Sequence, residues 1–233
     1  MSPTINKADQ AYDRILSMIT FQELRPGSMV SEGMLMDATG FGRTPVREAL
    51  QRLARERMVE IHPRRGNIIP PISVEVQLKL LELRRAVEEL AVRMAARRAS
   101  PEQQRTMLAL ADQLGGPDCA NDLHAYGHSL RLVHECIVTA AQNEYLRLAM
   151  APLQGLSRRF WFANLANIKN RETEMRKAAS YHAAALRAIA RSDESAASAA
   201  ALALNDYLTE YAYQTLRRID DRPKHKESLA ASG

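Results

Sequence analysis

The 233-residue sequence has few of the features that mark secreted or membrane proteins. Its only two cysteines, Cys119 and Cys136, cannot build a disulfide framework, which favours a reducing compartment. No apolar run approaches the roughly 18 residues that a membrane span needs. Residues 1–10 also lack the hydrophobic core of a signal peptide. These absences predict a cytoplasmic protein that makes no membrane contact.

The clearest predicted boundary in the chain is the pair Pro70 and Pro71, through which no helix can continue. The sequence before this pair contains glycine, proline and short β-branched runs, whereas the sequence after it is rich in good helix formers. We therefore predict a small domain over residues 1–72 and a helical domain over 73–221. The polar tail at 222–233 is expected to be disordered.

Three helices are predicted in the first domain. Apolar residues at helical spacing indicate the first over residues 8–23. Ser31 can cap the second, and Gly40 can close it. The third is expected to begin with Thr44 as its N-cap and Pro45 at its first helical position.

A β-hairpin is predicted to follow the third helix. Residues 59–62 and 67–69 are the expected strands, and residues 63–66 form a basic turn between them. Three helices followed by a hairpin is the plan of a winged helix-turn-helix. The protein carries a formal net charge of +5, and residues 43–65, with seven arginines and three glutamates, hold +4 of it.

The third helix carries the side chains that are best suited to reading DNA. Arg43 and Arg47 are four residues apart, and arginine can make bidentate hydrogen bonds to guanine in the major groove. Threonine hydroxyls and helix N-termini can contact phosphates. The alternative interpretation is a solvated basic face, in which Arg52 pairs with Glu48 and Glu56 along the helix.

The segment Arg43–Leu53 resembles the recognition-helix signature of the GntR family of bacterial transcription regulators, and the similarity extends over residues 8–72. The resemblance implies DNA contacts from five residues: Arg43, Thr44, Arg47, Arg65 and Gly66. The last two fall at the tip of the wing, which reaches the minor groove in this family. One departure is Gly33, where family members often carry a basic or polar side chain.

After Ser73 the sequence divides into about six helical stretches. The first is expected over 74–98, and a capping box of Ser100 and Gln103 opens the second. Later stretches are predicted at 120–141, 143–168, 171–191 and 193–218. The predicted buried stripe of the first stretch consists of Leu80, Leu83, Val87, Leu90 and Met94.

These stretches resemble the all-helical FCD effector domain of FadR-type regulators. The similarity lies in Glu82–Glu88, Val133–Glu135 and Tyr181–Leu186. It implies a mainly α protein in which a helical bundle binds a small metabolite, for which we expect an organic acid. It also implies a homodimer that binds a near-palindromic double-stranded operator, most often as a repressor.

Many such domains hold a divalent metal, such as zinc or nickel, through one aspartate and three histidines. His134 and His182 match two of these ligands. Leu130 stands where the aspartate is expected, and Leu204 stands where the last histidine is expected, with Asn205 one residue further. The metal set is incomplete, and a pair of buried core histidines is the alternative interpretation.

Arg84 matches a basic position that faces the effector pocket of the family. Its guanidinium could bind an effector carboxylate together with His134 and His182, or it could simply pair with Glu88 four residues later. Asp206 is a conceivable additional metal ligand.

The sequence thus predicts a DNA-binding regulator, with no catalytic residues, whose operator affinity a metabolite modulates. Two alternatives stay open. One is a regulator that binds DNA constitutively, and the other is a helical metalloenzyme fused to a DNA-binding module, which would need a complete ligand set.

Overall fold

The structure, a computed structural model, describes residues 6–116, 122–166 and 168–220. The chain forms two compact units. The first consists of Met1–Ser73 together with Ala151–Asn167, and the second consists of Val74–Met150 together with Ile168–Gly233. The predicted tail at 222–233 lies outside the described residues.

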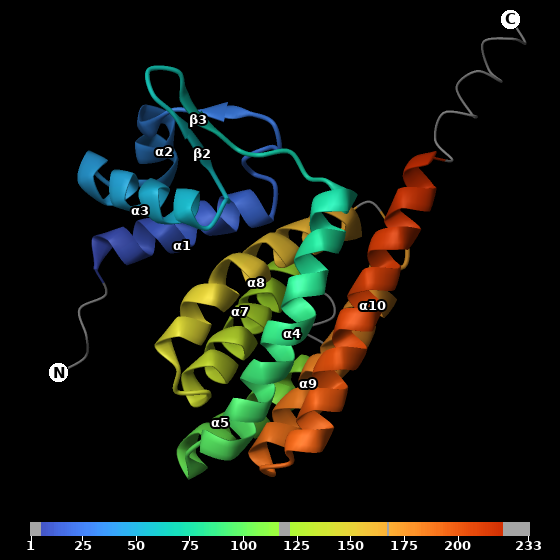
Figure 1. Cartoon of the computed structure of the whole chain (residues 1–233). Coiled ribbons are helices and arrows are strands. Elements are labelled where there is room, and N and C mark those ends of the chain that lie inside the picture. The colour runs from blue at the N-terminus through green and yellow to red at the C-terminus, as the bar shows by residue number, and fades with distance from the viewer. Residues whose placement is uncertain (1–5, 117–121, 167, 221–233) are drawn as a thin grey trace, which may run out of the picture. The chain divides into compact units, whose positions relative to one another are not determined.

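The first unit has the predicted winged helix-turn-helix fold (Figure 1). Its helices are α1 (Lys7–Thr20), α2 (Glu32–Thr39) and α3 (Arg43–Arg55). Its strands are β1 (Met29–Val30), β2 (Glu60–His62) and β3 (Gly66–Ile68), arranged antiparallel in the order β1-β3-β2. The hairpin was predicted, whereas the two-residue strand β1 was not, because it is too short to show a period-two pattern.

The helix ends test the capping predictions. Ser31 caps α2 by accepting a hydrogen bond from the Met34 amide, and Gly40 closes it in the left-handed conformation, as predicted. The prediction that Thr44 caps α3 is wrong. That helix begins at Arg43 after Gly42, which offers no side chain to its first amides.

The core of the first unit lies between α1 and α3. Ile15 and Ile19 of α1 are fully buried, as are Val46 and Leu53 of α3. The end of α8 (Glu144–Leu165) belongs to the same unit.

Two contacts join that end of α8 to the first 73 residues. The rings of Phe162 and Phe21 lie 5.0 Å apart, and the buried Arg159 donates a hydrogen bond to the Pro70 carbonyl. These contacts explain why residues 151–167 group with the first unit rather than with the helices that flank them in sequence.

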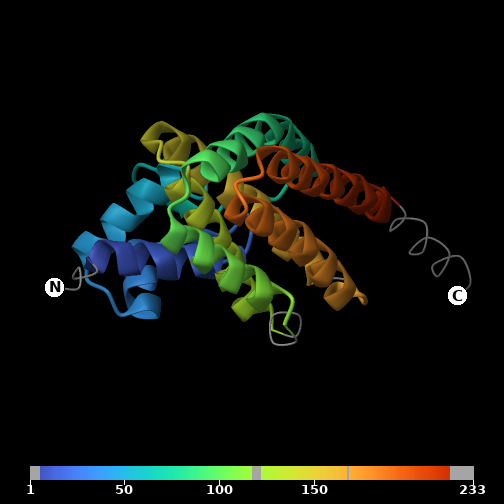
Figure 2. The same ribbon diagram turned by 90° about the horizontal axis from the view of Figure 1, so that it is seen from below.

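The second unit is a helical bundle, as predicted. It contains α4 (Val74–Arg98), α5 (Pro101–Leu114), α7 (Leu123–Ala140), α9 (Arg171–Ala190) and α10 (Glu194–Asp220), together with the first turns of α8. The capping box of Ser100 and Gln103 opens α5 as expected. Helix α10 runs beside α4 and α9, which Figures 1 and 2 both show.

The predicted buried stripe of α4 is only partly present, because Leu80 is buried and Val87 and Met94 are half-buried, but the other two members are not. Leu83 and Leu90 are 57% and 51% exposed, and the opposite side of the helix, including Arg84 and Glu88, faces the interior. Arg84 and Glu88 can be buried because they form an ion pair with one another. With that side of α4 facing inward, Leu83 and Leu90 lie on the surface.

Candidate DNA-binding surface and effector site

The first two turns of α3 expose the residues that the sequence predicts to contact DNA. Arg43, Thr44 and Arg47 are all exposed, whereas Val46 and Leu50 on the other side of the helix are buried. No side chain caps the beginning of this helix, so its positive dipole end and first amides face solvent. This end can therefore accept phosphate oxygens beside two guanidinium groups.

The Arg47 side chain is held by a residue that the sequence did not single out for this role. Its Nε donates a hydrogen bond to Oε1 of Glu32 on α2, over 2.7 Å. The pair is partly exposed, so it orients the guanidinium without removing it from solvent. Fifteen residues separate the two partners, and no local spacing rule predicts such a pair.

The tip of the wing is basic and exposed. Arg64 and Arg65 lie in the turn between β2 and β3, and Gly66 begins β3 with a φ of 100°, which a side chain rarely adopts. The buried Asn67 donates from its Nδ2 to the Val30 carbonyl, which ties β3 to β1. The structure therefore brings Arg65 and Gly66 to the predicted wing tip.

Arg52 packs against side chains of its own domain, Tyr12 on α1 and Glu56 just after α3. Its guanidinium lies 3.7 Å from the ring centroid of Tyr12, and its Nε is 3.4 Å from Oε1 of Glu56, the predicted partner along the helix. The Tyr12 hydroxyl donates to Oε2 of Glu56, and burial and the charge of Glu56 raise the tyrosine pKa. This arrangement fastens α3 to α1.

In the second unit, the structure brings together His134 on α7 and His182 on α9. Their ring centroids lie 5.5 Å apart in an edge-to-face arrangement, and both residues are buried. Burial, followed by the nearby charge of Arg84, lowers the pKa of His182 to about 3. His182 is therefore a neutral imidazole at physiological pH.

Arg84 is paired with Glu88. Its Nε and Nη2 donate to the two carboxylate oxygens over 2.6 and 3.0 Å, and both side chains are about 5% exposed or less. Of the two sequence interpretations of Arg84, the pairing along the helix is therefore present. The charge of the guanidinium is balanced inside the bundle.

The residues around the histidine pair do not fit a metal centre. Leu130 and Leu204 are buried at the two positions where further ligands were expected. Asn205 donates its amide to the Leu81 carbonyl over 3.2 Å, and Asp206 pairs with Arg85 on the surface. Within the described ranges, no group of three or more His, Cys, Asp or Glu residues is placed to hold a metal ion.

A winged helix-turn-helix with a basic recognition helix, joined in one chain to a helical bundle, defines a DNA-binding transcriptional regulator. Residues 7–69 match the model of bacterial regulatory proteins of the gntR family, and residues 79–206 match the FCD domain. The chain belongs to the GntR family, and its second unit carries an FCD domain, which is a metabolite-binding effector domain.

Known relatives are also regulators. The chain is 30% identical over 183 residues to the Nta operon transcriptional regulator of Aminobacter aminovorans, covering 77% of this chain and 83% of that protein. Among solved structures, E. coli McbR/YncC superposes with a TM-score of 0.76 at 19% identity, covering 91% of this chain and all of that one. A GntR-type regulator from Rhodococcus sp. RHA1 gives a TM-score of 0.63 at 21% identity, covering 90% and 97%. These two likenesses confirm the fold.

Within the part of the chain that the structure describes, no helix is both long and apolar enough to cross a membrane.

Proposed function

We propose that the protein is a repressor that binds its operator through Arg43, Thr44 and Arg47 of α3 and through Arg65 and Gly66 of the wing. The observation that carries this proposal is the exposed, uncapped beginning of α3, where the two arginines flank the helix dipole. Base contacts by arginine in the major groove then supply sequence specificity, and the wing adds a second, basic contact.

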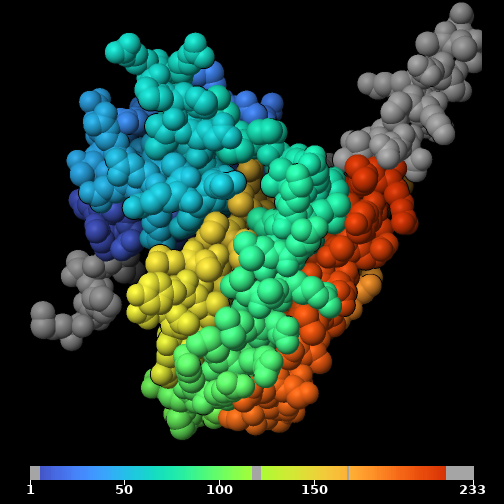
Figure 3. Space-filling model, in the orientation of Figure 1, coloured from blue at the N-terminus to red at the C-terminus, as the bar shows by residue number. Residues whose placement is uncertain are grey.

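We propose further that the regulator acts as a homodimer. Val76, Leu83 and Leu90 are more than half exposed, and their spacing of seven residues forms one apolar stripe along α4. Figure 3 shows that α4 lies open to solvent along its length beside α10. A second copy of the same stripe would bury these side chains, and two winged domains would then read two half-sites.

The proposed effector is an organic acid that binds among Arg84, His134 and His182, in a domain spanning residues 73–221. Arg84 is the cation for its carboxylate, and the neutral His182 imidazole can donate or accept one hydrogen bond. Since Glu88 already occupies the guanidinium fork, the effector carboxylate has to displace or share that partner. Binding would thereby shift α4 and change operator affinity.

The test is fluorescence anisotropy with a labelled DNA fragment from upstream of the protein's own gene. Arg47→Ala should weaken specific binding by about 1–3 kcal/mol. Arg14→Ala is the matched control, because Arg14 is an exposed arginine of α1 that pairs with Glu23 outside the recognition surface. Equal affinity of wild type and Arg47→Ala would contradict the proposal.

The same complex tests the effector. Organic acids should release wild-type protein from DNA and should fail to release Arg84→Lys, which keeps the charge but loses the bidentate fork. A wild-type complex that no acid dissociates would favour the constitutive regulator instead, an alternative that the Arg84–Glu88 pairing supports.

A further inference from the structure

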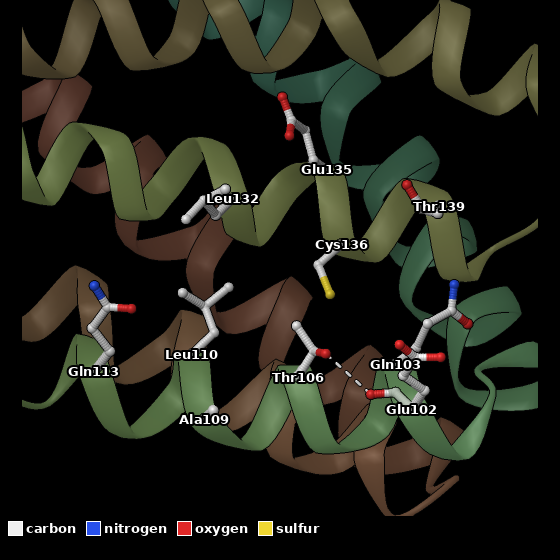
Figure 4. Close-up of a pocket in the computed structure, with 10 residues that line it drawn as sticks. All are labelled: Glu102, Gln103, Thr106, Ala109, Leu110, Gln113, Leu132, Glu135, Cys136 and Thr139. Carbon is white, nitrogen blue, oxygen red and sulfur yellow. Dashed lines mark hydrogen bonds between the residues drawn. The ribbon is translucent and has the colours of Figure 1, made fainter. Parts of the chain in front are cut away.

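A groove runs between α5 and α7 in the second unit, with a cavity volume of about 480 Å³ (Figure 4). This volume is within the range of small-molecule sites. Leu110 points from α5 toward α7, on which Leu132 lines the groove, and the sulfur of Cys136 points from α7 into the gap toward Thr106. None of these four residues belongs to the DNA-binding surface or to the proposed effector site.

The groove is separate from the proposed effector site. On α7, the residues that line the groove lie on the opposite side of the helix from His134, because successive residues turn by about 100°. Leu132, Cys136 and Thr139 are exposed or half-buried, whereas Val133, His134 and Ile137 are buried. Helix α7 therefore presents one face to the histidine pair and the other to the groove.

The groove lining combines an apolar centre with carboxylates. The centre is formed by Leu110, Leu132 and Cys136, and the carboxylates belong to Glu102 and Glu135. The ten lining residues include no lysine or arginine.

The two carboxylates differ in their partners. Glu135 forms a partly exposed ion pair with Arg131, with Oε1 3.2 Å from Nη1. Glu102 stands near the beginning of α5, and among the described residues no cation pairs with its carboxylate. Glu102 is therefore the groove carboxylate that no described side-chain cation offsets, although the dipole of α5 also favours its charge.

We propose that this groove is a second small-molecule site and that it takes an organic monocation with an apolar chain. The ammonium group lies against the Glu102 carboxylate at one end. The carbon chain covers Leu110, Leu132 and the Cys136 thiol. The site is independent of the effector site proposed above, so the failure of either leaves the other in place.

The thiol provides a direct reporter of occupancy in the full-length protein. In a Cys119→Ser background, alkylation of Cys136 by the neutral reagent N-ethylmaleimide is followed by mass spectrometry. Hexyltrimethylammonium is the probe, and hexanoate is the anionic probe with the same chain. Burial raises the pKa of the Cys136 thiol and slows the reaction, but this effect is common to all samples.

The cation should protect Cys136 saturably, and at ten times its Kd mass action predicts alkylation about tenfold slower. Hexanoate at the same concentration should leave the rate unchanged. Glu102→Gln should raise the Kd of the cation about threefold, the size expected for one partly exposed ion pair. Glu172→Gln, which removes an exposed carboxylate of α9 outside the groove, should leave protection at the wild-type level.

Two results would overturn the proposal. One is equal protection by the cation and by hexanoate, which would mean an apolar crevice without charge selection. The other is no protection by either probe. Circular dichroism of each variant verifies that a lost signal reflects the groove rather than unfolding.

Discussion

Among the arginine–glutamate pairs of this protein, Arg47–Glu32 and Arg84–Glu88 differ most in their consequences, because the exposure of a pair decides what it can do. The Arg47–Glu32 pair is partly exposed, with side-chain accessibilities of 58% and 32%, so a DNA base can replace the carboxylate at little cost. The Arg84–Glu88 pair is only 4% and 5% exposed. In this buried pair, removal of one partner leaves the charge of the other unpaired in the interior.

Glu88→Gln should therefore destabilise the protein by about 3–5 kcal/mol, the cost of leaving a buried charge without its partner. Urea unfolding measures this difference. Glu82→Gln on the exposed side of α4 is the matched control and should change stability by less than about 0.5 kcal/mol. The double variant Arg84→Met/Glu88→Leu should recover most of the loss, since it removes both charges. A Glu88→Gln protein as stable as Glu82→Gln would refute this account of the pair.

His182 gives a pH dependence of stability with a definite sign. Its pKa is about 3 in the folded protein against 6.5 ordinarily, so below pH 6.5 the unfolded chain takes up a proton that the folded chain refuses. The free energy of unfolding therefore falls as pH decreases from 6.5 toward 3, by up to about 1.4 kcal/mol per pH unit.

His182→Gln removes this contribution. The difference in unfolding free energy between wild type and His182→Gln, measured in urea at pH 7, 6, 5 and 4, should shift steadily against wild type as the pH falls. His128→Gln, on the exposed side of α7, is the control that should keep the wild-type pH dependence. A difference that stays constant across this range would show that His182 is not held neutral by burial.

At the scale of elements, local signals predict helix ends well and helix faces poorly. The caps at Ser31, Gly40 and Ser100 depend on single residues, and the structure confirms all three. The beginning of α3 was misplaced because Thr44 before Pro45 satisfies the capping rule two residues after the observed N-cap, Gly42. Strand β1 is defined by its pairing with β3. The two strands lie far apart in the sequence, so no local pattern predicts this pairing.

The face of α4 and the contents of the candidate site show the same limit. Apolar spacing alone puts Leu83 inside and Arg84 outside, but a neutralised Arg84–Glu88 pair reverses the assignment. Sequence reasoning found the DNA-contacting candidates and the histidine pair from a family motif. It could not find Glu32, whose partner is distant in sequence, or the groove of α5 and α7, which depends on how two helices pack.

Gly33 inside α2 and Gly40 just after it should respond in opposite directions to alanine. Gly40 has a φ of 73° and open space around it, so Gly40→Ala should cost about 1–2 kcal/mol of backbone strain alone. Gly33 lies inside the helix, where an added Cβ meets only the Ser31 hydroxyl at 3.8 Å. Gly33→Ala should therefore stabilise by about 0.5–1 kcal/mol. Urea unfolding of the two variants measures both signs, and a loss of stability in both would contradict this reasoning.

At the scale of the whole molecule, the proposed homodimer predicts a mass of about twice 26.1 kDa in light scattering after gel filtration. Leu83→Glu places a charge in the α4 stripe and should shift the protein toward the monomer, with weaker operator binding as a consequence. Leu108→Glu is the matched control, because Leu108 is 42% exposed on α5, away from the stripe. An unchanged mass for Leu83→Glu would rule out this stripe as the dimer contact.

The grouping of residues 151–167 with the first 73 residues has a consequence for how such regulators can recombine. The chain passes from one compact unit to the other three times, at 73–74, 150–151 and 167–168, rather than through one linker. A gene crossover at residue 73 would leave Phe162 and Arg159 of this chain's α8 facing a foreign module in place of Phe21 and Pro70. Functional chimeras between relatives should therefore exchange residues 1–73 and 151–167 together. Otherwise the foreign module must have a surface that can pack against this chain's α8.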